Sequence, residues 1–148
     1  MPRRVFFSFD YQMVYKVGLI VKNLPGVVPT AAAGFADSTE WDEKKVKGDL
    51  EVKDMIDQAL EGTTVSVIFI TEGAVNRKYI NYEIYQSLAH GNGMVAVQIH
   101  HLPNKDGSVD TPGDIPSQIA DNGFRAYKYT NSEDLAGWIE EAALIAGK

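Results

Sequence analysis

The fold of this chain is decided by residues 65–84, which have the sequence VSVIFITEGAVNRKYINYEI. The first part, Val65–Ile70, is dominated by β-branched residues and lies between two glycines, a pattern that predicts a buried strand. The residues after it predict a helix, for which Asn76 is the expected N-cap. A buried strand followed by a helix is the unit from which parallel α/β sheets are built.

Glu83 occupies an unusual position on this predicted helix. Helical spacing gathers three residues into an apolar face that can pack on the sheet: Ile80, Ile84 and Leu88. Glu83 and Tyr79 lie on the neighbouring face, so the carboxylate would lie beside the packed seam, partly removed from water. Such a carboxylate is a candidate for chemistry. The alternative, which the pattern alone favours, is an exposed residue paired with Lys78 or Arg77.

Similar patterns extend outward from this unit in both directions. They predict strands over 4–9, 94–99 and 124–129 and helices over 11–22, 50–60 and 135–145. A short strand is also expected near residues 34–36, a mobile loop from there to residue 47, and a surface loop over 101–118. Strand and helix alternate along the chain, which predicts an α/β fold with an open parallel sheet of about five strands and helices on both faces.

Length and composition narrow the class of protein. The 148 residues predict one domain spanning 1–148, long enough to bury a core. A net charge of −6 is unfavourable for non-specific nucleic-acid binding, which depends on neutralising phosphates. No apolar run reaches the roughly 18 residues of a membrane span, no signal peptide is indicated, and the lack of cysteine excludes thiol catalysis and cysteine-based zinc sites. We expect a cytoplasmic protein that binds a small molecule or a protein partner, with no nucleic acid and no membrane involved.

Several common kinds of site have no counterpart in the sequence. There is no phosphate-binding glycine loop followed by lysine, and no Gly-x-Gly-x-x-Gly after the first strand. A phospho-acceptor receiver domain would need Asp at the end of the third strand, where Thr71 and Glu72 stand. The adjacent His100 and His101 would point to opposite faces of a strand, so we expect ordinary loop histidines and no metal site.

The ligand site is expected where the strands end. In open parallel sheets, ligands bind beyond the carboxyl ends of the strands, which places Ser8, Phe9 and Asp10 beside the start of the helix that carries Glu83. Phe7 and Phe9 alternate with Ser8 and therefore share one face of the first strand. Asp10 is either the N-cap of the first helix or a ligand contact, and a helix that begins at the crevice allows both.

Four stretches occur in a characteristic order and spacing: RVFFSF at 4–9, GTTVSV at 62–67, RKYINYEI at 77–84, and GNG at 91–93 leading to VQIH at 97–100. Taken together, they resemble the TIR-like family, in particular the bacterial TIR-like proteins of the Thoeris antiphage system. The resemblance implies a flavodoxin-like (TIR-like) fold and, by position, a catalytic Glu83. Many TIR enzymes have tryptophan four residues before that glutamate, where this chain has Tyr79.

The resemblance also implies an activity. Enzymatic members cleave NAD, as substrate and without a further cofactor, at the nicotinamide–ribose bond, and Thoeris members release a cyclic ADP-ribose isomer that switches on a partner effector protein. The expected substrate-binding residues are Phe7, Ser8, Phe9, Asp10, Tyr79 and Asn81, and Tyr82 would add to an aromatic surface that excludes water. Two other interpretations stay open: a non-catalytic module that forms a homo-oligomer or assembles with an effector, and a sensor that binds a nucleotide without cleaving it.

Overall fold

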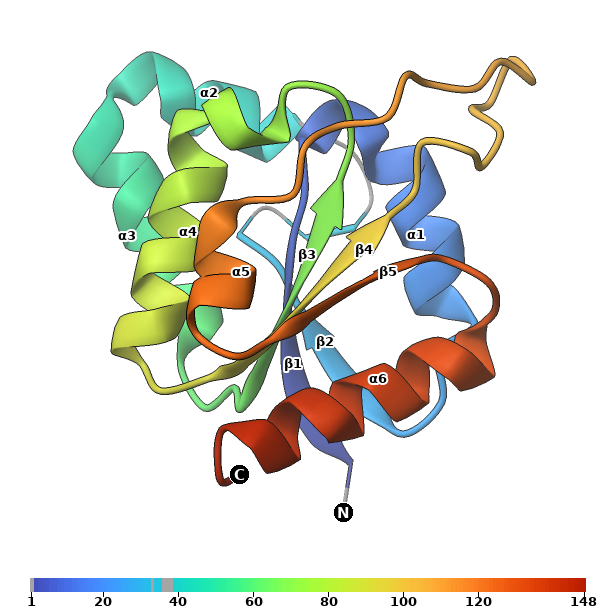
Figure 1. Ribbon diagram of the computed structural model, residues 1–148. Coiled ribbons are helices and arrows are strands. Elements are labelled where there is room, and N and C mark those ends of the chain that lie inside the picture. The colour runs from blue at the N-terminus through green and yellow to red at the C-terminus, as the bar shows by residue number, and fades with distance from the viewer. Residues whose placement is uncertain (1, 33, 36–38) are drawn as a thin grey trace.

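Five parallel strands form one open sheet in the computed structural model, which describes residues 2–32, 34–35 and 39–148 (Figure 1). The strands are β1 (Arg3–Ser8), β2 (Val27–Thr30), β3 (Val65–Ile70), β4 (Gly93–Gln98) and β5 (Arg125–Lys128). Their order in the sheet is β2-β1-β3-β4-β5, and every neighbouring pair is parallel. This is the flavodoxin-like order, in which the chain changes direction along the sheet between β1 and β3. The predicted α/β fold class is confirmed.

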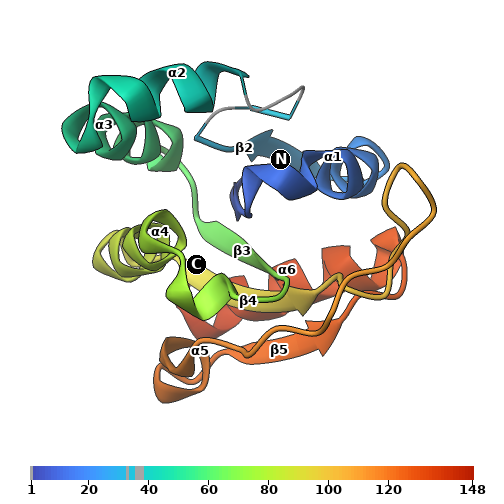
Figure 2. The ribbon, with the colours of Figure 1, turned by 90° about the horizontal axis from the view of Figure 1, so that it is seen from above.

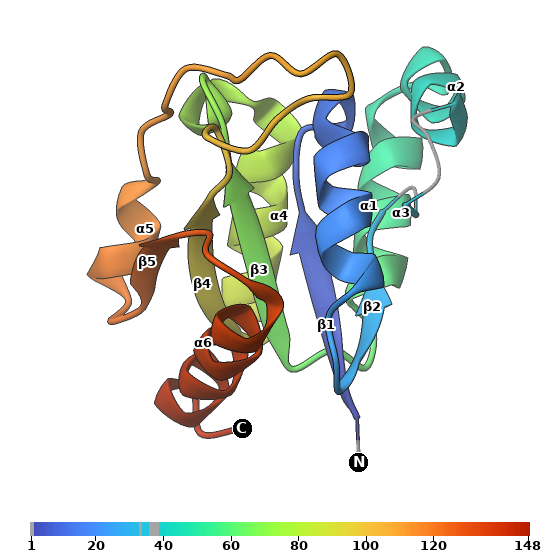
Figure 3. The same cartoon turned by 90° about the vertical axis from the view of Figure 1, so that its right-hand side faces the viewer.

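Helices cover both faces of the sheet. α1 (Val14–Lys22) and α6 (Ser132–Ile145) lie on one face, whereas α3 (Asp49–Leu60), α4 (Lys78–Ala89) and α5 (Ser117–Asp121) lie on the other (Figure 2). α2 (Thr39–Lys47) packs on α3 near the end of the sheet where the strands finish (Figure 3). Two short 3-10 turns, η1 (Tyr11–Met13) and η2 (Ala74–Asn76), lead into α1 and α4. Within the described part of the chain, no helix is both long and apolar enough to cross a membrane.

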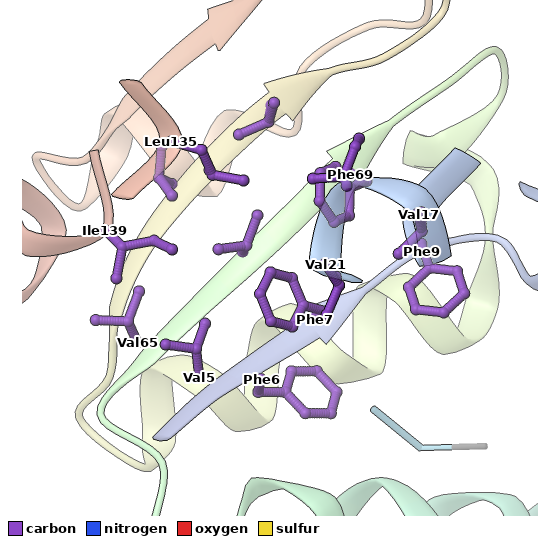
Figure 4. Packing of buried hydrophobic residues seen from close by; sticks show 14 of the residues in the cluster. Val5, Phe6, Phe7, Phe9, Val17, Val21, Val65, Phe69, Leu135 and Ile139 are labelled. Atoms are coloured by element: carbon purple, nitrogen blue, oxygen red, sulfur yellow. The ribbon is translucent and has the colours of Figure 1, made fainter. Parts of the chain in front are cut away.

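Alternation along the central strands builds two hydrophobic layers. Odd-numbered residues of β3 pack with α1 and α6, whereas Ile68 and Ile70 pack with Ile80 and Ile84 of α4. Figure 4 shows much of the first layer, in which Phe7 of β1 and Phe69 of β3 lie with side chains of α1 and α6; Phe6 points to the other side of β1. Each large apolar side chain that is fully buried contributes roughly 1.5–3 kcal/mol relative to exposure. Because β1 and β3 are held in this way from both faces, they provide a rigid support for the residues at their ends.

The helix that carries Glu83 begins later than expected. Asn76 is not its N-cap: that residue closes η2, and α4 begins at Lys78 with Arg77 as the N-cap. The 3-10 turn follows Gly73, whose φ of +76° is a left-handed conformation that favours glycine. Glu83 therefore lies in the second turn of α4, close to the edge where β3 ends.

The edge strand and the segment after it were also predicted wrongly. The strand expected near residues 34–36 lies at Val27–Thr30, where it pairs with β1; residues 36–38 lie outside the described residues. This strand is only partly buried and contains Pro29, which edge strands tolerate. It therefore lacks the long apolar run by which a buried strand is predicted. From residue 39 on, the expected mobile loop is the helix α2. The sequence of α2 is polar on most sides, so it lacks the apolar periodicity by which a packed helix is predicted. The buried side chain of Trp41 anchors it to the fold.

The long connection between β4 and α5 is tied to the fold at two points. The buried Lys16 ammonium of α1 donates to the Asp110 carboxylate at 2.5 Å and to the Ile99 carbonyl at 3.3 Å. Gly113 passes so close to Thr71 that an added Cβ would lie 1.9 Å from the Thr71 carbonyl oxygen. The connection is irregular up to residue 116, as expected, and it closes over the carboxyl end of β3 (Figure 3). The loop was expected to reach residue 118, but the short helix α5, which was not predicted, already begins at Ser117.

Candidate active site

Glu83 is buried inside the fold although it is an acidic residue. Only 1% of it is exposed. Its Oε1 accepts a hydrogen bond at 2.8 Å from the hydroxyl of Ser8, the last residue of β1. Its Oε2 is also buried and has no hydrogen-bond partner among the described residues. The alternative of an exposed glutamate paired with Lys78 or Arg77 is therefore wrong, because those two cations pair with other carboxylates.

Burial controls the protonation of this side chain. Desolvation raises the pKa of Glu83 from 4.5 to about 8, and the hydrogen bond from Ser8 opposes that rise. The carboxyl group of the protein alone is therefore mostly protonated at neutral pH. A buried carboxyl oxygen without a hydrogen-bond partner is uncommon in folded proteins. A carboxyl group with a strongly raised pKa is typical of functional sites. A cation bound beside Glu83 would stabilise its charged form.

A cavity of about 580 Å³ opens beside Glu83. It lies at the carboxyl ends of β1 and β3, where the chain changes direction along the sheet and where flavodoxin-like folds bind their ligands. Its volume is within the roughly 300–1,000 Å³ of small-molecule sites. The lining comprises residues 9–12, Trp41, Asp42, Lys45, residues 76–80 and Glu83. The cavity is thus built from the turn after β1, from α2 and from the start of α4.

Four aromatic residues that contact one another, Phe9, Tyr11, Trp41 and Tyr79, form an aromatic wall along the cavity. Successive ring centroids lie 4.6 Å apart for Phe9 and Tyr11, 4.5 Å for Tyr11 and Trp41, and 5.3 Å for Trp41 and Tyr79. At these distances aromatic pairs attract one another beyond the effect of area burial. The wall therefore holds α2 beside α4, and it offers a flat apolar surface on which a base or pyridine ring can stack.

The hydroxyl of Tyr79 is fixed by Asp49 at the start of α3. Tyr79 Oη–H donates to Asp49 Oδ1 at 2.5 Å, and Lys78 Nζ donates to the same oxygen at 2.7 Å. The hydrogen bond to Asp49 raises the pKa of Tyr79 to about 12, so the phenol stays neutral at physiological pH. Tyr79 thus keeps its ring on the cavity while its hydroxyl ties α4 to α3.

The structure brings most of the sequence-predicted site residues to this cavity. Phe9, Asp10, Tyr79 and Glu83 line it, and Ser8 is connected to it through the hydrogen bond to Glu83. Asp10 combines the two features that the sequence left open. It is the N-cap of η1, where its carboxylate accepts the backbone N–H two residues on, and it also faces the cavity.

Phe7, Asn81 and Tyr82 do not line the cavity. Phe7 points to the opposite face of the sheet, where it stacks on a phenylalanine of β3. Asn81 Nδ2 donates to the Val75 carbonyl at 3.0 Å and so fixes the turn before α4. The Tyr82 hydroxyl bonds to Asp57, on the contact between α3 and α4. Strand alternation separates Phe7 from Ser8, and helical spacing turns Asn81 away from residues 79 and 83. The hydroxyl of Tyr82 is instead held at the contact with α3 by its hydrogen bond to Asp57.

Several other lining residues were not among the predicted site residues, including Tyr11, Trp41, Lys45 and Arg77. Tyr11 directly follows Asp10 and could have been included by position. Arg77 was considered only as a partner of Glu83, but its guanidinium pairs with Asp10 at 3.1 Å. Trp41 and Lys45 lie on α2, and no local pattern in the sequence indicates that this helix lies beside α4.

Fold and site together define the class of protein: a flavodoxin-like α/β domain with a buried carboxyl group in a ligand-sized cavity at the switch point of its sheet. Residues 6–104 match the family described as Thoeris protein ThsB, TIR-like domain. A curated relative from Bacillus cereus (strain MSX-D12), named "Putative cyclic ADP-D-ribose synthase ThsB1", is 31% identical over 133 residues, which cover 88% of this chain and 67% of the relative. The chain belongs to the Thoeris ThsB family of TIR-like domains. Every residue that lines the cavity lies inside the matched range.

Proposed function

We propose that this protein cleaves NAD at the bond between nicotinamide and ribose, with Glu83 as the catalytic residue, and releases a cyclised ADP-ribose as a signal in antiphage defence. The observation that carries the proposal is the buried, unpartnered Oε2 of Glu83 on the wall of a cavity of ligand size. Membership of the Thoeris family and the name of the relative support the same activity. NAD is the substrate, and the reaction requires no further cofactor.

A single carboxylate is sufficient for this reaction. Most glycosidases use two, because one must protonate the leaving oxygen. In NAD the leaving group is a pyridinium: the bond from C1′ to the ring nitrogen breaks, its electron pair moves to that nitrogen, and neutral nicotinamide departs without a proton. The positive charge is left on the ribose as an oxocarbenium ion, which an ionised Glu83 stabilises.

Glu83 must be ionised at that moment, although its pKa in the protein alone is about 8. The pyridinium of NAD would bring a positive charge to Oε2, and a nearby opposite charge lowers the pKa of a carboxyl group. Substrate binding would therefore release the proton of Glu83 to solvent. Ser8 favours the same ionised state, because its hydroxyl donates to Oε1.

The aromatic wall favours cyclisation over hydrolysis. Rings stacked along the substrate keep water from C1′, and a nucleophilic atom elsewhere in the same ADP-ribose then attacks at high effective concentration. The new bond forms at C1′ and the nucleophile loses its proton, so the products are nicotinamide, cyclised ADP-ribose and one proton. A diffusible product of this kind would reach a separate effector protein.

The proposal is tested by incubating concentrated protein with NAD and separating the products by chromatography and mass spectrometry. Wild-type protein is expected to release nicotinamide, Glu83→Gln to release none, and the exposed control Glu61→Gln to match the wild type. The mass of the second product distinguishes linear from cyclised ADP-ribose, which differ by one water. Nicotinamide release by Glu83→Gln would refute the role of this residue. Binding of NAD without release, even with phage-infected lysate added, would favour the nucleotide-sensing interpretation.

A further inference from the structure

The first turn of α4 forms part of the cavity wall. Lys78, Tyr79 and Ile80 all line the cavity, so the backbone at this helix end lies at its surface. The first N–H groups of a helix have no partners within the helix, and together with the helix dipole they attract anions. α4 has 12 residues, its N-cap Arg77 provides no side-chain cap, and its first turn contains no acidic residue. This end of the cavity is therefore suited to a negatively charged group.

Two cationic side chains from different elements line the same cavity. Arg77 directly precedes α4, and Lys45 lies on α2. One guanidinium nitrogen of Arg77 contacts the Asp10 carboxylate at 3.1 Å, and the guanidinium carries five N–H donors, so most of its donors are not used by this contact. Lys78 also lines the cavity, but its ammonium is paired with the Asp49 carboxylate at 2.6 Å. Asp10 and Asp42 are the lining carboxylates besides Glu83. Arg77 and Lys45 are therefore the side chains that can offer N–H donors to an anion beside the helix end.

The distance from this helix end to Glu83 fits a nicotinamide nucleotide. Glu83 follows Lys78 by five residues, which is about 7.5 Å along the helix axis at ~1.5 Å per residue. In NAD, five covalent bonds connect C1′ of the nicotinamide ribose to its 5′-phosphorus, a span of roughly 6 Å at ~1.5 Å per bond. Side chains lean toward the N-terminus of their helix, which shortens the first distance. A ligand with C1′ at Glu83 Oε2 would therefore place its phosphate at the N-terminus of α4.

We propose that the N-terminus of α4, together with Arg77 and Lys45, is a diphosphate subsite that selects dinucleotides over nucleosides. The inference rests on the proposed function, because it takes Glu83 as the point where C1′ lies. The buried, unpartnered Oε2 of Glu83 is the independent sign that a ligand enters this cavity. The substrate class is a nicotinamide riboside with a 5′-diphosphate: its cationic ring goes to Glu83 and its anionic group goes to the helix end.

The subsite is tested with Arg77→Gln and Lys45→Gln. Lys47→Gln is the matched control, because Lys47 is an exposed lysine of α2 that does not line the cavity. Steady-state cleavage is measured for NAD and for nicotinamide riboside, which has no phosphate. Each subsite variant is expected to raise KM for NAD roughly tenfold, equivalent to about 1.4 kcal/mol, with kcat nearly unchanged. Cleavage of the riboside should not change, and Arg77→Lys should restore most of the loss.

Two kinetic results would overturn the subsite. One is an unchanged KM for NAD in both variants. The other is an equal loss of kcat/KM for NAD and for the riboside, which would indicate damage to the fold. Calorimetric titration of Glu83→Gln with inorganic pyrophosphate gives a readout without catalysis. Binding should weaken when Arg77→Gln or Lys45→Gln is added and should be unaffected by Lys47→Gln. If the wild type cleaves no NAD but pyrophosphate binding depends on these two cations, the subsite stands and the proposed function fails. If NAD is cleaved but pyrophosphate binding does not depend on Arg77 and Lys45, the proposed function stands and the subsite fails.

Discussion

Replacing Glu83 by glutamine is expected to stabilise the protein, and to do so more strongly as the pH rises. Burial raises the pKa of Glu83 from 4.5 to about 8, so the folded protein holds a proton that the unfolded chain releases between these values. The stability that depends on this proton is complete below the unfolded pKa and is lost as the pH rises through the folded pKa. A neutral glutamine avoids this loss and can still accept the hydrogen bond from Ser8.

The size of the effect follows from the two pKa values. One pKa unit corresponds to about 1.4 kcal/mol, so the unfolding free energy of the wild type loses about that much per pH unit between roughly pH 5 and 8. The difference between the variant and the wild type should therefore widen by about 3.5 kcal/mol from pH 5 to pH 8, slightly less than the full slope gives, because the two titrations are incomplete at the ends of this range. An ordinary domain is stabilised by only ~5–15 kcal/mol. The buried carboxyl group of Glu83, the proposed catalytic group, is thus a substantial cost to folding.

Urea denaturation followed by tryptophan fluorescence gives the unfolding free energy of both proteins at pH 5, 6, 7 and 8. The value at pH 5 accounts for any constant difference in packing between glutamate and glutamine. The Glu61→Gln variant controls for the removal of an exposed negative charge. A difference that stays constant from pH 5 to pH 8 would refute the reasoning, because Glu83 would then have nearly the same pKa in the folded and unfolded protein.

The remaining predictions concern the ionisation of Glu83, its hydrogen bond, and the buried ion pair. If the ionised carboxylate is the active form, as proposed, the kcat/KM for NAD should rise with pH and level off above about 8. Initial rates of nicotinamide release from pH 6 to 9.5 measure this. Ser8→Ala removes a hydrogen bond that lowers the pKa of Glu83, so the same profile should move to higher pH, with roughly tenfold less activity at pH 7 per pKa unit. Asp110→Ala leaves the Lys16 ammonium buried without its carboxylate and should cost roughly 3 kcal/mol, whereas Lys16→Met leaves a partly solvated carboxylate and should cost less; urea denaturation compares the two.

Each of these expectations has a contrary result. A flat or falling pH profile would mean that the ionised carboxylate is not the active form. A Ser8→Ala profile with an unchanged midpoint would show that this hydroxyl does not influence the acid. Equal losses of stability in the Asp110 and Lys16 variants would show that the ammonium group of Lys16 is not buried in solution.

Local patterns in the sequence determined the central part of this fold. Val65–Ile70 is a strand with the predicted bounds, and the helices observed at Asp49–Leu60 and Ser132–Ile145 begin within three residues of the predicted ones. These elements pack on the core along a whole face or on both faces, so their own residues carry the apolar pattern whatever their partners are. The position of Glu83 beside an apolar helical face was visible for the same reason, and the family resemblance pointed to the same residue.

Tertiary structure alone decided how these elements make a site. Ser8 and Glu83 are 75 residues apart in sequence, and only the pairing of β1 with β3 and the packing of α4 on them bring the hydroxyl to the carboxyl group. α2 is polar and contributes Trp41 and Lys45 to the cavity through contacts with distant segments. The raised pKa of Glu83 likewise comes from the surroundings that exclude water from it. A sequence pattern records which face of an element is apolar, but burial, pairing and charge depend on what meets that face across the fold.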